Sequence, residues 1–138
     1  MTVLSDAQVR FQGDSDSFVD LQSAVRALEP AAAELKAHPD RHALLVGTTA
    51  SGKDEAMCLD LSLRRAKAVK RLLVEQLGVP EDRLSCIGLG TQDPWHIDDR
   101  DENGQVEILA AQNRKVFLLD ADSDEAEGIR KVGGLLEE

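Results

Sequence analysis

The sequence predicts an α/β sandwich in which helices pack on one face of a mixed four-stranded sheet. Short apolar runs alternate with segments of helical periodicity, in the order β-α-β-α-β-(α)-β. The chain has 138 residues, 42% of them hydrophobic, which is enough for one domain with a single core. We expect this domain to span residues 1–120 and residues 121–138 to form an acidic C-terminal tail.

The N-terminal third predicts a strand followed by a helix. Residues 7–11 have the pattern of a short strand, and a turn rich in Gly, Asp and Ser separates them from a helix that begins near Phe18. The apolar face of this helix repeats every three or four positions: Leu21, Val25, Leu28, Ala32 and Leu35. Because Pro30 lies within this stripe, we expect a kink there, or a break and a restart.

The remaining elements follow in regular order. Strands are predicted at 43–46, 84–89 and 116–119, a long helix at 55–77, and a short helix at 106–112. Gly78 and Pro80 end the long helix. The acidic tail contains a partial apolar stripe, so a docked terminal helix is an open alternative to a solvated tail.

The charge balance excludes two classes of partner. Sixteen basic against 26 acidic residues give a net charge of −10, and aromatic residues make up only 3%. Nucleic acids and anionic membrane surfaces both require a basic counterpart, so neither is an expected partner. No apolar run approaches the roughly 20 residues of a membrane helix, so we expect no direct membrane insertion of this segment.

Cysteine and histidine give no catalytic or metal-binding pattern. Cys58 and Cys86 lack the spacing of zinc ligands, and the sequence leaves open whether they pair. His38, His42 and His96 are expected at the surface, and spacing alone identifies no Ser–His–Asp arrangement. These residues therefore identify no catalytic group, and we expect no cofactor.

One loop has the spacing of a phosphate-binding motif. Gly47 to Lys53 reads G-x-x-x-x-G-K between a predicted strand and a predicted helix. The motif continues with Ser or Thr, whose hydroxyl binds magnesium, but this chain has Asp54, which would repel phosphate. Nucleotide binding is therefore a distant alternative.

A second loop resembles the first half of a calcium-binding loop. Asp99, Asp101 and Asn103 precede Gly104 with the expected spacing, but the twelfth position, which supplies a bidentate Glu, is Ala110. The same residue types are favoured in solvated turns. These three residues are thus a weak calcium candidate, and we predict no other metal site.

Arg65 is the basic residue most suited to binding. Five basic residues lie between positions 64 and 71, and most must face solvent. Arg65 directly precedes Ala66 at the edge of the apolar stripe, where its planar guanidinium can reach a carboxylate. We expect Arg65→Ala to leave the fold intact, because Ala66, Val69 and Leu73 provide the packing.

Several short motifs occur in a fixed order between residues 11 and 116. They are Phe11-x-x-Asp14-Ser15, Val46-Gly47-Thr48-Thr49, Leu61-Ser62-x-x-Arg65-Ala66-x-x-Val69, Gly78-Val79-Pro80, Gly88-Leu89-Gly90 and Asn113-Arg114-Lys115-Val116. Together they resemble the OmpA-like domain family, which includes OmpA C-terminal domains, Pal and MotB.

This resemblance implies non-covalent binding of peptidoglycan in the cell envelope, outside the cytoplasm. Such domains hold the diamino acid of the stem peptide between an Asp, which ends a Gly-His-Thr-Asp motif, and the Arg of Leu-Ser-x-x-Arg-Ala. By analogy, the site residues here are Arg65, Thr49, Ala50, Asp14 and Ser15. The resemblance also implies that the domain is part of a longer, anchored protein.

The chain departs from the family pattern at the acid. Ala50 occupies the position of the Asp, fifteen residues before Arg65 as in the family, and Thr48 replaces the His. Asp14 and Asp54 are both candidates to replace the missing acid. Two hypotheses follow: a peptidoglycan-binding domain with an altered pocket, or a degenerate domain that serves as a spacer or binds other envelope proteins. Homodimer formation stays open.

Overall fold

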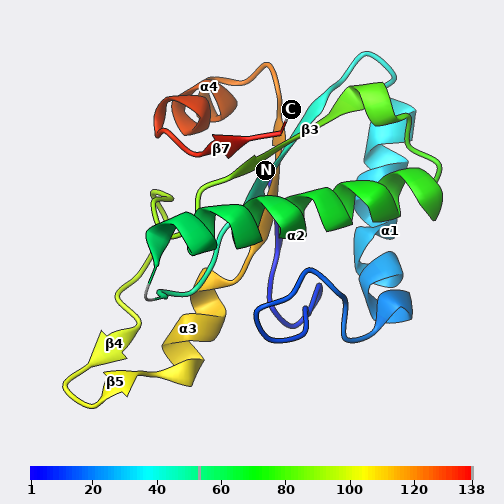
Figure 1. The fold of residues 1–138 in the computed structure, drawn as a ribbon. Coiled ribbons are helices and arrows are strands. Elements are labelled where there is room, and N and C mark those ends of the chain that lie inside the picture. Colours follow the sequence, from blue (N-terminus) through cyan, green and yellow to red (C-terminus); the bar gives the residue numbers. More distant parts are fainter. Residues whose placement is uncertain (53, 138) are drawn as a thin grey trace.

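The computed structural model describes residues 1–52 and 54–137 and confirms the α/β fold (Figure 1). Its elements are β1 (Thr2–Leu4), α1 (Leu21–Ala37), β2 (Ala43–Gly47), α2 (Glu55–Glu75), a 3-10 turn (Glu81–Arg83), β3 (Leu84–Gly88), β4 (Arg100–Asp101), β5 (Gly104–Gln105), α3 (Glu107–Asn113), β6 (Val116–Asp120), α4 (Asp124–Lys131) and β7 (Leu135–Leu136). Among the described residues, no helix is both long and apolar enough to cross a membrane.

The main sheet has the strand order β1-β6-β2-β3-β7, which is five strands rather than the predicted four. β2 and β3 are parallel and are joined through α2, whereas the other neighbours are antiparallel. The additional strand is β7, which comes from the C-terminal tail. β4 and β5 form a separate hairpin beside α3 (Figure 1).

The first strand lies earlier than predicted. The prediction of a strand at 7–11 is wrong, because the first strand, β1, covers Thr2–Leu4. The chain turns after β1, where the amides of Gln8 and Val9 both donate to the carbonyl oxygen of Ser5. Phe11 forms only an isolated bridge with Phe18, and the two rings stack with centroids 4.8 Å apart. The turn allows both Leu4 and Val9 to reach the core, which a continuous strand would not.

α1 continues through Pro30 without the break that we considered. The carboxylate of Asp20 caps its first turn by accepting from the amides of Gln22 and Ser23. The ring of Pro30 lies on the exposed face, while Leu28 and Ala32 on the other face are buried in the core. The packing of the buried face therefore keeps the helix continuous at Pro30, which has no amide hydrogen to donate.

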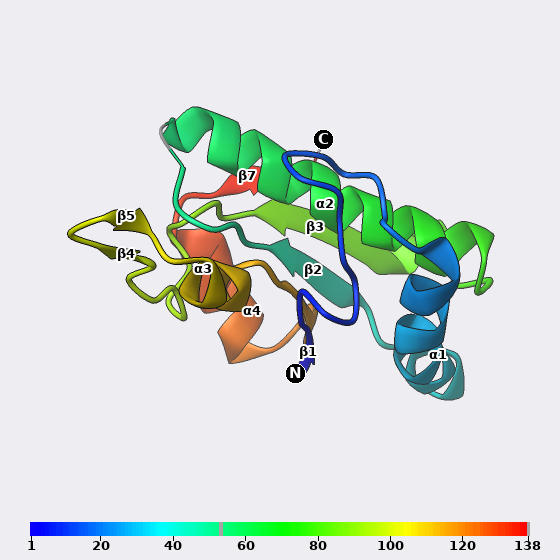
Figure 2. The ribbon, with the colours of Figure 1, turned by 90° about the horizontal axis from the view of Figure 1, so that it is seen from below.

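The sheet has a hydrophobic core on each face, because side chains alternate along every strand. Leu45 of β2 faces the core covered by α1 and α2, whereas Leu44 and Val46 face the core covered by α4. Figure 2 shows the sheet between α2 and α4. The expectation that helices cover only one face is therefore wrong.

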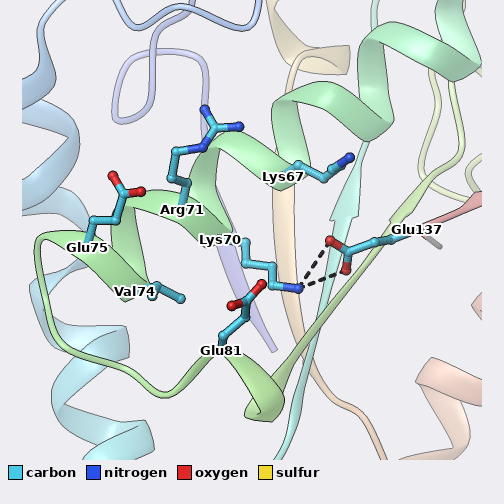
Figure 3. A pocket seen from close by; sticks show the side chains of 7 residues that line it. All are labelled: Lys67, Lys70, Arg71, Val74, Glu75, Glu81 and Glu137. Atoms are coloured by element: carbon cyan, nitrogen blue, oxygen red, sulfur yellow. Dashed lines mark hydrogen bonds and ion pairs between the residues drawn. The ribbon is translucent and has the colours of Figure 1, made fainter.

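The acidic C-terminal segment provides the cover for the second face. Ala126 and Ile129 of α4 are buried there, and β7 adds to the free edge of β3. Beyond β7, the Glu137 carboxylate pairs with Lys70 of α2 at 3.0 Å (Figure 3). Both side chains are mostly buried, so this ion pair joins the end of the chain to the long helix.

We predict that Ile129→Ala will lower the free energy of unfolding by about 3 kcal/mol, because it leaves a cavity in the second core. Val132→Ala, a substitution of an exposed residue directly after the same helix, is the matched control and should have little effect. Urea denaturation measures both. Equal stability of the two variants would mean that α4 does not contribute to the core.

Candidate functional site

A pocket of about 440 Å³ lies between the N-terminal loop, α2, and the loop after β2. It is lined by Asp6, Arg10, Phe11, Gly13, Asp14, Thr49, Ala50, Ser51, Gly52, Cys58, Leu61, Arg65, Gln105, Glu107 and Arg114. The structure thus brings Arg65, Thr49, Ala50 and Asp14 to one pocket. Ser15 contacts Arg65 through its carbonyl oxygen.

α2 reaches this pocket because it packs directly on β2 and β3. A Cβ atom at Gly47 would overlap the carbonyl oxygen of Ser62, and a Cβ at Gly88 would overlap the backbone of α2. The hydroxyl of Ser62 accepts from the amide of Gly90 at 2.9 Å, and the carbonyl of Gly90 accepts from the amide of Thr49 at 3.0 Å. The helix therefore positions the loop after β2 through two hydrogen bonds.

Arg65 is a buried cation that is held by main-chain oxygens. The residue is 6% exposed, and its Nε donates to the carbonyl of Ser15 at 2.9 Å, with a longer contact of 3.5 Å from Nη2 to the carbonyl of Gln12. Its guanidinium also lies over the Phe11 ring, 5.0 Å from the centroid. Within the described residues, no carboxylate forms an ion pair with it.

The charges around Arg65 act in opposite directions. Burial lowers the pKa of the Arg65 guanidinium and Arg114 adds to this effect, whereas Asp6 and Asp14 oppose it. Asp14 has a left-handed backbone conformation, with φ of 51°, that turns the loop at the pocket. Asp14 and Asp6 are therefore the acids that act electrostatically on the buried cation.

Sequence reasoning missed the ion pairs on the rim. The Arg114 guanidinium binds both carboxylate oxygens of Glu107, at 2.6 and 2.9 Å, and this contact lowers the pKa of the Glu107 carboxyl. Asp6 lies 3.5 Å from Arg10 and 3.9 Å from Arg114. Arg114 belongs to the motif Asn113-Arg114-Lys115-Val116, but nothing in the sequence indicates that it pairs with Glu107, seven positions earlier.

In the described part of the loop after β2, three amides are already paired and are not available to a phosphate. A phosphate cradle needs free amide donors, but the amides of Thr48, Thr49 and Ser51 donate to the carbonyls of Lys115 and Gly90 and to the carboxylate of Asp99, respectively. Asp54 caps α2 by accepting from the amides of Ala56 and Met57, and Lys53 lies outside the described residues. Of the two candidate acids, only Asp14 lines the pocket.

A polar cluster that spacing did not indicate lies behind this loop. His96, expected at the surface, has a side chain that is only 19% exposed. Its Nε2 lies 3.3 Å from the hydroxyl oxygen of Ser51, and its Nδ1 lies 3.9 Å from the carboxylate of Asp93. The long loop after β3 folds back to create these contacts, so they were not visible in the sequence.

The calcium candidates are not arranged as one ligand set. Asp99 is fully buried, and its carboxylate accepts from the Ser51 amide and from the Asn113 side chain. Burial opposes the ionised form, but these hydrogen bonds lower the pKa of the Asp99 carboxyl. Asp101 and Asn103 instead form the exposed β4–β5 turn, where the Asp101 carboxylate accepts from the Asn103 amide. No metal-binding group of His, Cys, Asp or Glu occurs among the described residues.

The two cysteines are free and occupy different environments. Cys58 lines the pocket, whereas Cys86 lies on β3 in the first core. Burial raises the pKa of the Cys86 thiol to about 12, so this thiol stays protonated at neutral pH.

The elements and the pocket describe a small α/β domain, and comparison with known proteins assigns its family. The model of the OmpA family matches residues 10–107. The crystal structure of the peptidoglycan-associated lipoprotein from Burkholderia pseudomallei is 34% identical in sequence, with a TM-score of 0.64 over 80% of this chain and 86% of that chain. The chain belongs to the OmpA family.

Two further solved structures share the fold at lower identity. The periplasmic domain of Helicobacter pylori MotB is 21% identical, with a TM-score of 0.63 over 94% of this chain and 81% of that chain. The cell wall anchor of the T6SS from Pseudomonas aeruginosa is 20% identical, with a TM-score of 0.52 over 84% of this chain and 76% of that one. No curated protein sequence matches the chain.

We predict that Arg65→Ala will lower the free energy of unfolding by roughly 1–3 kcal/mol, since it leaves the Ser15 carbonyl without its donor. This loss of stability differs from the expectation, based on packing alone, that the substitution leaves the fold unaffected. Arg64→Ala, which removes a neighbouring cation that is 41% exposed, should cost at most about 1 kcal/mol. Equal urea midpoints for the two variants would contradict a structural role for Arg65.

Proposed function

We propose that the chain is a non-catalytic domain that binds peptidoglycan non-covalently through the diamino acid of the stem peptide. The observation that carries this proposal is the Arg65 guanidinium, which is buried at the pocket without a carboxylate partner among the described residues. A ligand carboxylate would supply the charge-assisted contact that the protein itself does not provide.

We further propose that Asp14 replaces the acid that is missing at Ala50. Asp14 lines the same pocket as Arg65, and its negative charge opposes the lowering of the Arg65 pKa by burial. A ligand that carries both an ammonium and a carboxylate would then contact the Asp14 carboxylate and the Arg65 guanidinium in one pocket. The hydroxyl of Thr49 is buried and has no hydrogen-bond partner among the described residues, so it offers an additional polar contact.

The similarity to a lipoprotein described as peptidoglycan-associated supports this assignment of ligand. Because peptidoglycan lies outside the cytoplasm, the proposal places the domain in the cell envelope, as part of a longer anchored protein. We assign no catalytic role to any described residue of the pocket. The expected activity is therefore binding of the domain to the cell wall and not conversion of a substrate.

We predict that the purified domain will co-sediment with insoluble peptidoglycan, and that Asp14→Asn and Arg65→Lys will each weaken retention by roughly ten- to a hundredfold. Each variant loses a charge-assisted contact, which typically contributes about 1.5–3 kcal/mol. Arg26→Ala removes an exposed cation of α1, which does not line the pocket, and is the control for non-specific attraction. Thermal melting of each variant separates lost binding from lost fold.

We predict that Ala50→Asp will strengthen retention by about tenfold, because it restores the carboxylate that the family pattern places there. Ala50→Asn is the matched control, with the same size but no charge. If both variants bind equally well, the acid is not the missing element.

A degenerate domain that acts as a spacer or binds other envelope proteins is the second candidate, and the loss of the acid at Ala50 favours it. No retention of the native domain, together with retention of Ala50→Asp, would support this second function. Retention of the native domain that is lost in Arg65→Lys would exclude it.

A further inference from the structure

Ser51 is bound at every polar atom by the segment that follows β3. Its amide donates to the Asp99 carboxylate at 2.8 Å, and its carbonyl accepts from the Gln105 side chain at 2.8 Å. Its hydroxyl oxygen lies 3.3 Å from Nε2 of His96. Ser51 also lines the pocket, directly after Ala50. Ser51 is therefore a pocket residue whose hydroxyl has His96 as its neighbouring polar group.

The surroundings of His96 select one tautomer of its ring. Nδ1 of His96 lies 3.9 Å from Oδ1 of Asp93, which is longer than a hydrogen bond, and neither atom has a hydrogen-bond partner in the described structure. An ionised carboxylate only accepts hydrogen bonds, so it favours the tautomer with the proton on Nδ1. Nε2 is then an acceptor, and the Ser51 hydroxyl must donate to it.

We propose that His96, oriented by Asp93, turns the lone pairs of the Ser51 hydroxyl toward the pocket at neutral pH, where they accept a hydrogen bond from the ligand's ammonium group. This inference rests on the proposed binding of the stem-peptide diamino acid. It assigns to Ser51 part of the role that the family acid has at the neighbouring position, and it makes His96 a positioning residue.

Protonation of His96 reverses this arrangement. Both ring nitrogens then donate, so the Ser51 hydroxyl uses one of its two lone pairs to accept from Nε2 and its own proton is no longer held by the ring. One lone pair fewer is then available to accept from an ammonium. The charged groups around the ring are the carboxylates of Asp93 and Asp99, together with Lys115, which acts on Asp93. Ligand binding selects the neutral ring and is therefore expected to weaken when acid protonates the ring.

The tautomer can be measured without any ligand. Long-range ¹H–¹⁵N NMR spectra of the intact domain at about pH 7.5 should show the His96 ring protonated at Nδ1 and unprotonated at Nε2. Asp93→Asn should reduce the population of this tautomer. A ring protonated at Nε2 in the native domain would overturn the proposal, whatever the domain binds.

The contribution to binding is measured by co-sedimentation with peptidoglycan at about pH 7.5 and about pH 5.5. Retention of the native domain should fall by about fivefold or more at the lower pH, as expected for one hydrogen bond. Ser51→Ala should bind more weakly at the higher pH and lose most of this pH dependence, as should His96→Gln.

His38→Gln is the matched control, because it removes an exposed histidine at the end of α1 and should keep the full pH dependence. Equal retention of the native domain at both pH values would overturn the role of Ser51 and leave the proposed function standing. No retention at either pH would instead reject the proposed function and the ligand contact together, and the NMR spectra would still decide the orientation of Ser51.

Discussion

The close approach of α2 to β2 and β3 is the constraint on which the pocket depends. Gly47 and Gly88 have no side chain between the helix and the sheet, and Ser62 therefore reaches the amide of Gly90. The carbonyl of Gly90 in turn holds Thr49, so the loop after β2 is tied to the helix that carries Arg65. A larger residue at either glycine would force the helix away from the sheet and separate the two halves of the pocket.

Arg65 shows how a buried cation can be stable without an acid. Its guanidinium lies on the Phe11 ring and donates to main-chain carbonyls of the loop before α1, which replace part of the water that burial removes. The same contacts order that loop, including Asp14. Structural support and the proposed ligand binding therefore depend on one side chain, and measurements of binding at this position require a parallel measurement of stability.

Sequence periodicity predicted the central elements because their apolar residues occur at regular intervals, as in α2 and β2. It failed near the N-terminus, where a turn after Leu4 lets Val9 reach the core, and it did not predict that β7 would join the sheet. Family motifs pointed to Arg65 and Asp14, and both residues line the same pocket. They carried no information on Ser51 and His96, which are 45 residues apart and meet only through the folding of a long irregular loop.

The chain tolerates alanine at position 50 because the loop does not depend on that side chain for its shape. Thr48, Thr49 and Ser51 are each held through their amides, by acceptors on three different segments of the protein. An acid at position 50 would contribute to the ligand and not to the scaffold. Under the proposed function, alanine at this position changes the chemistry of the pocket at little structural cost, and the proposed contacts of Asp14 and Ser51 use the same backbone.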